Sequence, residues 1–302
     1  MPLAAVLDSN VFRSTGDDAS EALVSAERHR DVLALADAWT LIELLAHLKS
    51  RIDQAYWPCR RAIRRVARRC LDPRDGEPRV LIDTETQIAR LLLGRELAGP
   101  RASTAEIVRT CQFVAAAEDT QDLSEVAGTI ASLAVYVEGT EAWFAEFLRD
   151  LTDKLTAASA AAHPIPGDES PHIKIRRFLG SDDMLRLDAE ALALRAYEQA
   201  GVEPPDPIPE PDIRRVMSAC RAGSRATAMA LERVLCDGAK LDKTSTPNLI
   251  WDQQIAFNIG QQVAGRRLVV VTDDGFFAQA AAVAGFANSV RSVGQYRADL
   301  GL

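Results

Sequence analysis

Two strand-like segments near opposite ends of the chain are apolar on both faces, and each runs directly into aspartate. Residues 3–7 precede Asp8, and residues 268–272 precede Asp273 and Asp274. A strand without alternating polar residues is typical of the centre of a parallel sheet, where helices cover both faces. We therefore expect an α/β fold in which both ends of the chain contribute strands to one sheet.

The rest of the chain divides into three parts. Strand-like and helix-like segments alternate in residues 1–98 and again in 241–302, which favours a small central parallel sheet with crossover helices. Residues 99–240 contain only helical patterns, interrupted by proline-rich linkers at 160–171 and 201–211. We predict a discontinuous α/β domain formed by the two outer parts, with a large all-helical insertion between them.

The acids at the strand ends are candidate functional residues. Ligands bind beyond the carboxyl ends of the strands in open parallel sheets, so Asp8 and the pair Asp273 and Asp274 meet there if their strands are neighbours. The alternative is turn chemistry, because Asp often follows a strand as a helix cap or in an Asx turn. One member of the pair could be a ligand and the other a cap.

Asp252 is expected in a helix spanning residues 246–264, with Thr246 at the N-cap and Pro247 at the first helical position. Apolar residues at 255, 256, 259 and 263 follow it at helical spacing, so the acid belongs to the face that turns inward. Burying a carboxylate that has no partner costs free energy, because the charge loses its hydration. We therefore expect a cation or a metal ion beside Asp252.

Glu43 is the polar residue of an otherwise apolar stretch, residues 41–46. Two interpretations remain open for it. It could join the other acids, or it could close a capping box with Thr40, in which a Glu at the third helical position bonds back to the N-cap amide.

A cluster of carboxylates has a clear chemical use. Mg²⁺ and Mn²⁺ prefer oxygen ligands, and such an ion activates water and neutralises charge in phosphodiester hydrolysis. The four histidines lie outside the acidic motifs, which weighs against metal-free hydrolysis through histidine.

These motifs together resemble the PIN-domain family of nucleases. Residues 6–12, with Asp8 and Asn10, resemble its first strand, and residues 41–45 resemble its Glu-bearing helix. Residues 248–256 resemble the helix that presents its third acid, and residues 268–277 resemble its final acidic strand. The resemblance covers residues 1–98 and 241–302, and the helical block between them departs from compact members.

The resemblance implies a metal-dependent endoribonuclease that leaves 3′-hydroxyl and 5′-phosphate ends. Asp8, Asp252 and Asp274 would ligate Mg²⁺ or Mn²⁺, with a second ion left open, and Glu43 would complete the site or orient the attacking water. Asn10, Thr272 and Asp273 would support these four catalytic acids. Many bacterial members are toxins, so an antitoxin or other protein partner and self-association are left open beside the RNA substrate.

Charge locates one candidate contact surface for RNA. The net charge of −8 argues against a general basic coat, so any basic patch must be local. The predicted helix at residues 57–70 carries arginines on successive turns, opposite apolar positions. We predict that these arginines contact phosphates. The alternatives are that they bind an acidic partner or pair with the protein's own acids. The six residues are Arg60, Arg61, Arg64, Arg65, Arg68 and Arg69.

The remaining features are typical of an ordinary globular chain. The five cysteines are scattered, odd in number and without a CxxC pair, which favours buried thiols in a reducing cytosol. Without a leader-like or membrane-spanning apolar run, we expect a soluble cytoplasmic protein. The aromatic residues at 143, 144 and 147, with Leu148, are expected to form the core of the helical block.

Two other functions remain as alternatives. A haloacid-dehalogenase-like Mg²⁺ phosphatase would use Asp8 as its nucleophile, but such enzymes carry a second Asp two residues later, where this chain has Asn10. A non-catalytic module would keep the PIN-like fold and bind nucleic acid or protein without turnover.

Overall fold

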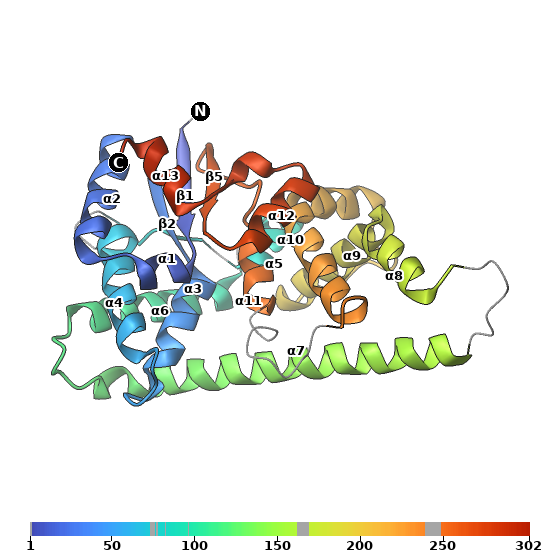
Figure 1. Ribbon diagram of the computed structural model, residues 1–302, viewed down its shortest axis with the longest axis horizontal. Helices are drawn as coiled ribbons and strands as arrows, with labels where there is room; N and C mark the ends of the chain where they lie inside the picture. The colour runs from blue at the N-terminus through green and yellow to red at the C-terminus, as the bar shows by residue number, and fades with distance from the viewer. Residues whose placement is uncertain are drawn as a thin grey trace.

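The two apolar strands predicted near the ends of the chain lie side by side in the computed structural model (Figure 1). β1 (Leu3–Leu7) pairs in parallel with β5 (Arg266–Val271) on one side and with β2 (Leu33–Asp37) on the other. β2 in turn pairs in parallel with β3 (Val80–Leu81). The fold is therefore mixed α/β with a mostly parallel sheet, as the sequence predicted. The structure describes residues 2–72, 76, 78–81, 83–95, 97–161, 169–238 and 249–302.

Two short strands extend the sheet beside β5. β6 (Val290–Arg291) pairs with it in parallel, and β4 (Gln262–Val263) pairs with it in antiparallel. The prediction of one helix through residue 264 is wrong, because Ala264 and Gly265 both take positive φ, of 51° and 72°. Positive φ at both central residues is what a two-residue type I′ hairpin requires.

Helices surround the sheet. Those of the first part are α1 (Ser9–Ser14), α2 (Asp17–His29), α3 (Ala38–Ala46), η1 (His47–Lys49), α4 (Tyr56–Val66), the π-helical turn η2 (Ala67–Leu71) and α5 (Thr84–Leu93). The middle of the chain contributes α6 (Ala98–Ala116), η4 (Ser124–Val126), α7 (Ala127–Ala161), α8 (Pro171–Leu179), α9 (Asp182–Gln199) and α10 (Glu210–Leu235). The last part holds α11 (Leu249–Ala256), α12 (Gly275–Ala284), η5 (Ala287–Ser289) and α13 (Val293–Leu300). Thr246 and Pro247, the predicted start of the Asp252 helix, lie outside the described residues.

Alternate residues of the strands enter two separate cores. Ala5 and Leu7 of β1 pack with α2, α3, α4, α6 and α13 on one face of the sheet. Ala4 and Val6 pack with α10, α11 and α12 on the other. This alternation follows from the period of two along a strand. It explains why β1 has no polar residue, since both of its faces are buried.

All regular structure described between residues 99 and 240 is helical, as predicted. These helices lie directly against the sheet-forming part of the chain: α6 contacts α3 and α4, while α10 contacts α5, α11 and α12. The division into a nuclease domain and an insertion stays a prediction. No helix among the described residues is long and apolar enough to cross a membrane.

A buried ion pair ties the two ends of the chain together. Arg69 donates to both carboxylate oxygens of Glu27, at 2.7–3.0 Å, and to the backbone carbonyls of Ala5 and Leu35. Tyr296 of α13 donates its hydroxyl to Glu27 at 2.6 Å. Because Arg69 and Glu27 are each 2% exposed, this network replaces nearly all of their hydration.

Candidate active site

Each of the four neighbouring parallel strands is followed by, or ends in, an aspartate. Asp8 follows β1, Asp37 is the last residue of β2, Asp83 follows β3 after one residue, and Asp274 lies beyond β5. Parallel strands present their carboxyl ends at one edge of the sheet. All four acids occupy helix N-cap positions, and the side chains of three of them accept a capping hydrogen bond, in α3, α5 and α12, while that of Asp8 does not cap α1. The alternative of helix capping therefore holds for these three acids. Whether an acid can also bind a ligand depends on the carboxylate oxygen that is not used for capping.

Asp8 is buried, with 4% of its surface exposed. Its Oδ2 accepts from the Thr272 hydroxyl at 3.0 Å and from the Asn10 amide at 3.4 Å. Burial raises the pKa of Asp8, and the hydrogen bond from Thr272 opposes this shift. Two of the three predicted supporting residues, Asn10 and Thr272, thus hold one oxygen of Asp8 in place.

The two acids after β5, Asp273 and Asp274, make different contacts. Asp274 accepts from the backbone N–H of Phe276 at 2.8 Å through Oδ1, which caps α12, and its own N–H donates to Thr272 Oγ1. Asp273 accepts from the N–H of Val293 at 2.9 Å and so fixes the start of α13. The second oxygen of Asp274 accepts no hydrogen bond from the described residues, which leaves that atom for the site.

Glu43 belongs to the acidic cluster and not to a capping box. α3 begins at Ala38, and Asp37 caps it by accepting from the N–H groups of Trp39 and Thr40. The capping-box interpretation is wrong because the helix starts earlier than expected. Glu43 instead lies 3.3 Å from the Arg13 guanidinium; burial raises its pKa, and the charge of Arg13 opposes the rise.

Asp252 shows most clearly that the acids converge. Burial raises its pKa to about 8, and the negative charges of Asp8, Asp274 and Glu43 add to this rise. Among the described residues it has no hydrogen bond or ion pair, and Arg233 is the cation close enough to lower its pKa. The four acids predicted from separate parts of the sequence are therefore close enough for the other three to raise the pKa of Asp252.

The donor chemistry of this cluster fits a hard divalent cation. Four carboxylates share one region. Asp252 and the second oxygen of Asp274 accept no hydrogen bond from the described residues, and hard cations bind such oxygens. As they stand, however, no three or more carboxylate, histidine or cysteine side chains among the described residues are arranged to hold a metal ion. The cluster thus suits a cation by its chemistry and charge, while the arrangement of its side chains does not enclose one.

Sequence reasoning missed Asp37, which is also at this edge. It is 2% exposed, and burial raises its pKa to about 6. Its Oδ1 caps α3, and its Oδ2 accepts from Asn258 at 2.8 Å. The signal was the same as for the other acids, an Asp directly after a strand. Because both oxygens are bonded, Asp37 has a structural role.

The long helix α7 passes close to the acidic edge of the sheet (Figure 1). Its Tyr136 stacks on Trp39 with ring centroids 6.4 Å apart, and its Glu141 accepts from the indole of Trp251 at 2.8 Å. Trp251 directly precedes Asp252 in the chain. A helix of the predicted insertion therefore borders the candidate site, and Tyr136 remains 46% exposed there.

The predicted arginine surface does not exist as one exposed stripe. Arg60 and Arg65 are buried and donate to backbone carbonyls of other segments. Arg64 also donates to a backbone carbonyl, and Arg68 pairs with a carboxylate of α2. Arg61 is exposed. The pattern failed because α4 packs against α1, α3 and α6 around much of its circumference, so several arginines join segments of the fold.

A different arginine is placed beside the acids. Arg233, in the last turn of α10, lies over the ring of Phe276 with its guanidinium carbon 4.9 Å from the ring centroid. Its side chain is exposed, and its charge acts on Asp252. No sequence motif marked this residue, because it reaches the acids only through the packing of α10 on α12.

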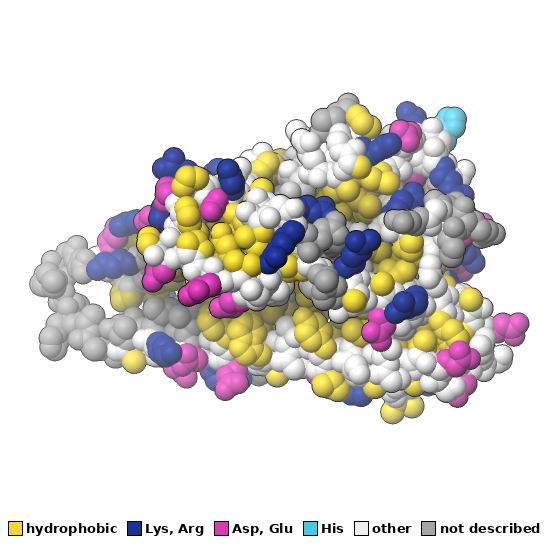
Figure 2. Space-filling view, turned by 180° about the vertical axis from the view of Figure 1, so that it is seen from behind, with side chains coloured by type: hydrophobic (Ala, Val, Ile, Leu, Met, Phe, Trp, Pro, Cys, Tyr) yellow, Lys and Arg dark blue, Asp and Glu magenta, His cyan; other side chains and the backbone are white. Residues whose placement is uncertain are grey.

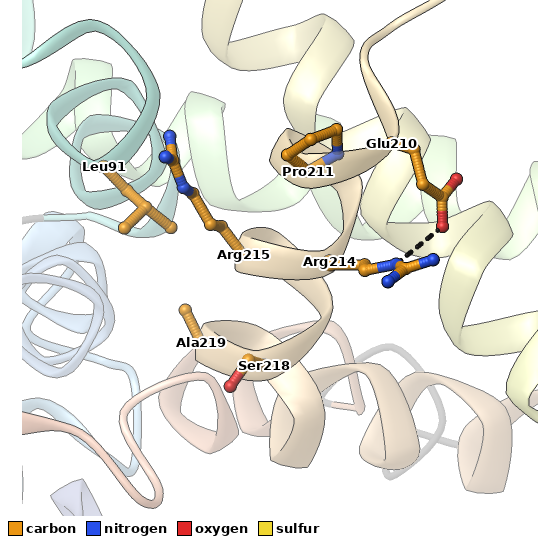
Figure 3. Close-up of a pocket in the computed structure, with 7 residues that line it drawn as sticks. All are labelled: Leu91, Glu210, Pro211, Arg214, Arg215, Ser218 and Ala219. Atoms are coloured by element: carbon orange, nitrogen blue, oxygen red, sulfur yellow. Dashed lines mark hydrogen bonds and ion pairs between the residues drawn. The ribbon is translucent and has the colours of Figure 1, made fainter.

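A shallow pocket near the other end of α10 is a separate feature. It has a volume of about 730 Å³ and lies between α5 and α10. Figure 3 shows Arg214 directed at Glu210 and Arg215 lying toward Leu91. From Arg214 to Arg233 the helix rises roughly 28 Å, at about 1.5 Å per residue. This pocket is not part of the acidic cluster.

Comparisons with protein family models, with curated proteins and with solved structures found no match to this chain.

Proposed function

We propose that this protein is a metal-dependent endonuclease of the PIN type that hydrolyses RNA at the cluster of Asp8, Glu43, Asp252 and Asp274. The observation that carries the proposal is the convergence on Asp252, whose pKa is raised to about 8 by burial and by the charges of the other three acids. Such strongly perturbed acids are concentrated at functional sites. A purely structural cluster would be expected to pair each of its buried acids, whereas Asp252 has no hydrogen bond or ion pair among the described residues and only the charge of Arg233 lowers its pKa.

Asp8, Asp252 and Asp274 are the residues that would hold Mg²⁺ or Mn²⁺. When bound, the ion would lower the pKa of a water molecule and neutralise charge on the phosphodiester. Thr272 and Asn10 hold Asp8 in one orientation through Oδ2. Glu43 would accept a proton or orient water, and its ion pair with Arg13 directs its carboxylate toward α1. Asn10 in place of a second Asp gives no support to the phosphatase alternative.

The test is cleavage of labelled single-stranded RNA, structured RNA and single-stranded DNA in Mg²⁺, Mn²⁺ or EDTA. We expect RNA cleavage that requires the metal and produces 5′-phosphate ends. Asp8→Asn should reduce the rate by at least about a hundredfold, the scale of losing a group that acts on the reacting atoms. Asp18→Asn is the matched control, because it makes the same charge change at an exposed position of α2.

Three outcomes would contradict this function. Equal cleavage by wild type and Asp8→Asn would indicate a contaminating nuclease. Binding of RNA without turnover in either metal would favour the non-catalytic module. Trapping of a phosphorylated aspartate would favour the phosphatase.

Arg233 is expected to bind a phosphate of the substrate beside the acids. Stacking on Phe276 holds its guanidinium in place while leaving it exposed, and a phosphate contact steadies the substrate without reacting. Arg233→Ala should raise KM about tenfold, the scale of one charged hydrogen bond, with kcat changed much less. Arg214→Ala, exposed in the same helix, should leave both unchanged. Equal effects of the two substitutions would contradict the assignment.

A further inference from the structure

An aromatic stripe runs along one face of α7 and begins beside the candidate active site. It consists of Tyr136, Trp143 and Phe147, which follow one another at intervals of seven and four residues and therefore share one side of the helix. They are 46%, 58% and 44% exposed. The predicted core is thus wrong for two of its four residues, since only Phe144 and Leu148 are buried. Exposed apolar side chains gathered in this way mark a binding surface.

The first member of the aromatic stripe is held next to the acids. Tyr136 is stacked on Trp39, with 15° between the ring planes, and its ring centroid is 6.4 Å from that of Trp251. Trp251 directly precedes Asp252 in the chain. Because Trp39 covers one ring face while Tyr136 remains 46% exposed, the tyrosine can stack a further planar group. Such a group lies beside a substrate that is bound at the acids.

The charges around Tyr136 favour an uncharged group on its ring. Burial raises the pKa of its hydroxyl, and the negative charges of Glu85 and Asp83 add to the rise. The same two carboxylates repel a phosphate that approaches the ring. A nucleobase is planar and uncharged, so it suits this position, while the phosphates of a strand belong on the side away from α5.

The other two members of the aromatic stripe line a large cavity between α7 and the helices α8 to α11. Its volume is about 870 Å³, within the range of small-molecule sites. Seen from behind, hydrophobic side chains gather on both sides of the hollow above α7 (Figure 2). Trp143 and Phe147 stack on each other with centroids 5.9 Å apart. Phe178 of α8, which is 43% exposed, also lines the cavity.

The accessible charge of this cavity is positive. Lys174 and Arg195 line it with exposed side chains. Asp188, the acid among the described lining residues, is half-buried and has the Ser224 hydroxyl and Arg195 beside it. Aromatic surfaces combined with cations are the features with which proteins bind single-stranded nucleic acid, since the bases stack and the cations attract the phosphates.

The spacing of the aromatic stripe selects unpaired bases. Tyr136 and Trp143 are about 10.5 Å apart along the helix axis, at about 1.5 Å per residue. Successive bases in a duplex strand are about 3.4 Å apart, and neighbouring bases cover their faces. The bases of a single strand can be splayed apart and stacked one by one on aromatic side chains.

We propose that the aromatic stripe is a track for single-stranded RNA that leads from the acidic cluster into the cavity. One base stacks on Tyr136, further bases pack against Trp143 and Phe147, and Lys174 and Arg195 attract the phosphates. The inference rests on the proposed function for the choice of RNA as the occupant. It narrows that substrate to strands whose bases are unpaired on one side of the cut.

Binding is measured by fluorescence anisotropy in EDTA, where a metal-dependent nuclease does not cut. The probes are a labelled RNA of about twelve nucleotides and a blunt duplex of the same sequence. We expect the single strand to bind at least about tenfold more tightly, the scale of one base stacked on an aromatic ring. Tyr136→Leu and Trp143→Leu should each weaken binding about tenfold, whereas Tyr136→Phe keeps the ring and should bind normally. Trp57→Leu, at an exposed position of α4 outside the aromatic stripe, is the control and should also bind normally.

Strands that lack a single base separate stacking from charge, because every phosphate stays in place. Removal of the base at one position or more should weaken binding to the wild type about tenfold. The leucine variant that lacks the corresponding ring should be insensitive to that removal. The proposal is overturned if both leucine variants bind like the wild type, if the duplex binds as tightly as the single strand, or if no base matters.

The cleavage assay distinguishes a failure of the track from a failure of the nuclease function. Metal-dependent cleavage in which neither leucine variant alters binding or the preference for single strands contradicts the track alone. Binding of single strands that depends on Tyr136 and Trp143 but leads to no cleavage supports the track and contradicts the nuclease function. Circular dichroism and thermal melting establish that each variant is folded.

Discussion

Asp252→Asn is expected to stabilise the metal-free protein at pH 8 by up to about 5 kcal/mol, given about 1.4 kcal/mol for each unit of pKa difference. Its carboxyl has a pKa of about 8 in the folded protein, raised by burial and by Asp8, Asp274 and Glu43, against a usual value of 3.8. Asparagine has a similar shape and no charge. The variant therefore removes both the desolvation cost and the repulsion from the other acids.

The gain should depend on pH in a defined direction. Below about pH 4 the Asp252 carboxyl is protonated in both the folded and the unfolded chain, so this group contributes no pH dependence. Between pH 4 and pH 8 the unfolded chain releases the proton while the folded protein retains it. The folded state of the wild type thus loses stability as pH rises through this window, and the variant should not show this loss. Urea denaturation in EDTA at pH 5 and pH 8 measures the difference.

Bound metal should reverse the order of stability, so that the wild type becomes more stable than Asp252→Asn. A cation that binds the folded state alone stabilises it in proportion to the logarithm of its concentration. We expect Mg²⁺ or Mn²⁺ to raise the Tm of the wild type at pH 8 and to raise that of Asp252→Asn much less. This measurement needs no substrate, so it separates metal binding from nuclease activity. Identical metal responses would argue against Asp252 as a ligand.

Glu27→Gln is expected to destabilise the protein by about 3–5 kcal/mol, the usual cost of leaving one partner of a buried ion pair behind. Arg69 would keep its charge at a site where 2% of its surface is exposed. Its remaining bonds to the carbonyls of Ala5 and Leu35 do not neutralise that charge. Urea denaturation at pH 7 measures the loss.

The same helix provides the control. Glu21 pairs with Arg68 at 3.0 Å, but the two side chains are 68% and 54% exposed. Glu21→Gln should therefore change stability by less than about 1 kcal/mol, as for other surface ion pairs. A loss for Glu27→Gln as small as this would mean that Arg69 gains water or moves its charge to the surface.

The sequence identified the candidate acids better than it identified the residues that contact them. Asp8 and the two acids after β5 were identifiable because local patterns mark a buried strand and the turn that ends it. Asp252 was identifiable because helical spacing placed a charge among apolar residues. The Ala264–Gly265 hairpin was missed because Ala in a left-handed turn has no sequence signature.

By itself, the sequence determined which segments are buried strands and which acids interrupt apolar faces, since both depend on neighbouring residues alone. Only the tertiary structure decided what each charge meets. It buried Arg60 and Arg65, brought Arg233 over Phe276 and left Trp143 at the rim of a cavity. Periodicity says that a side chain lies on one side of a helix. The packing of segments distant in the sequence decides whether that side faces water, a carboxylate or an unfilled space.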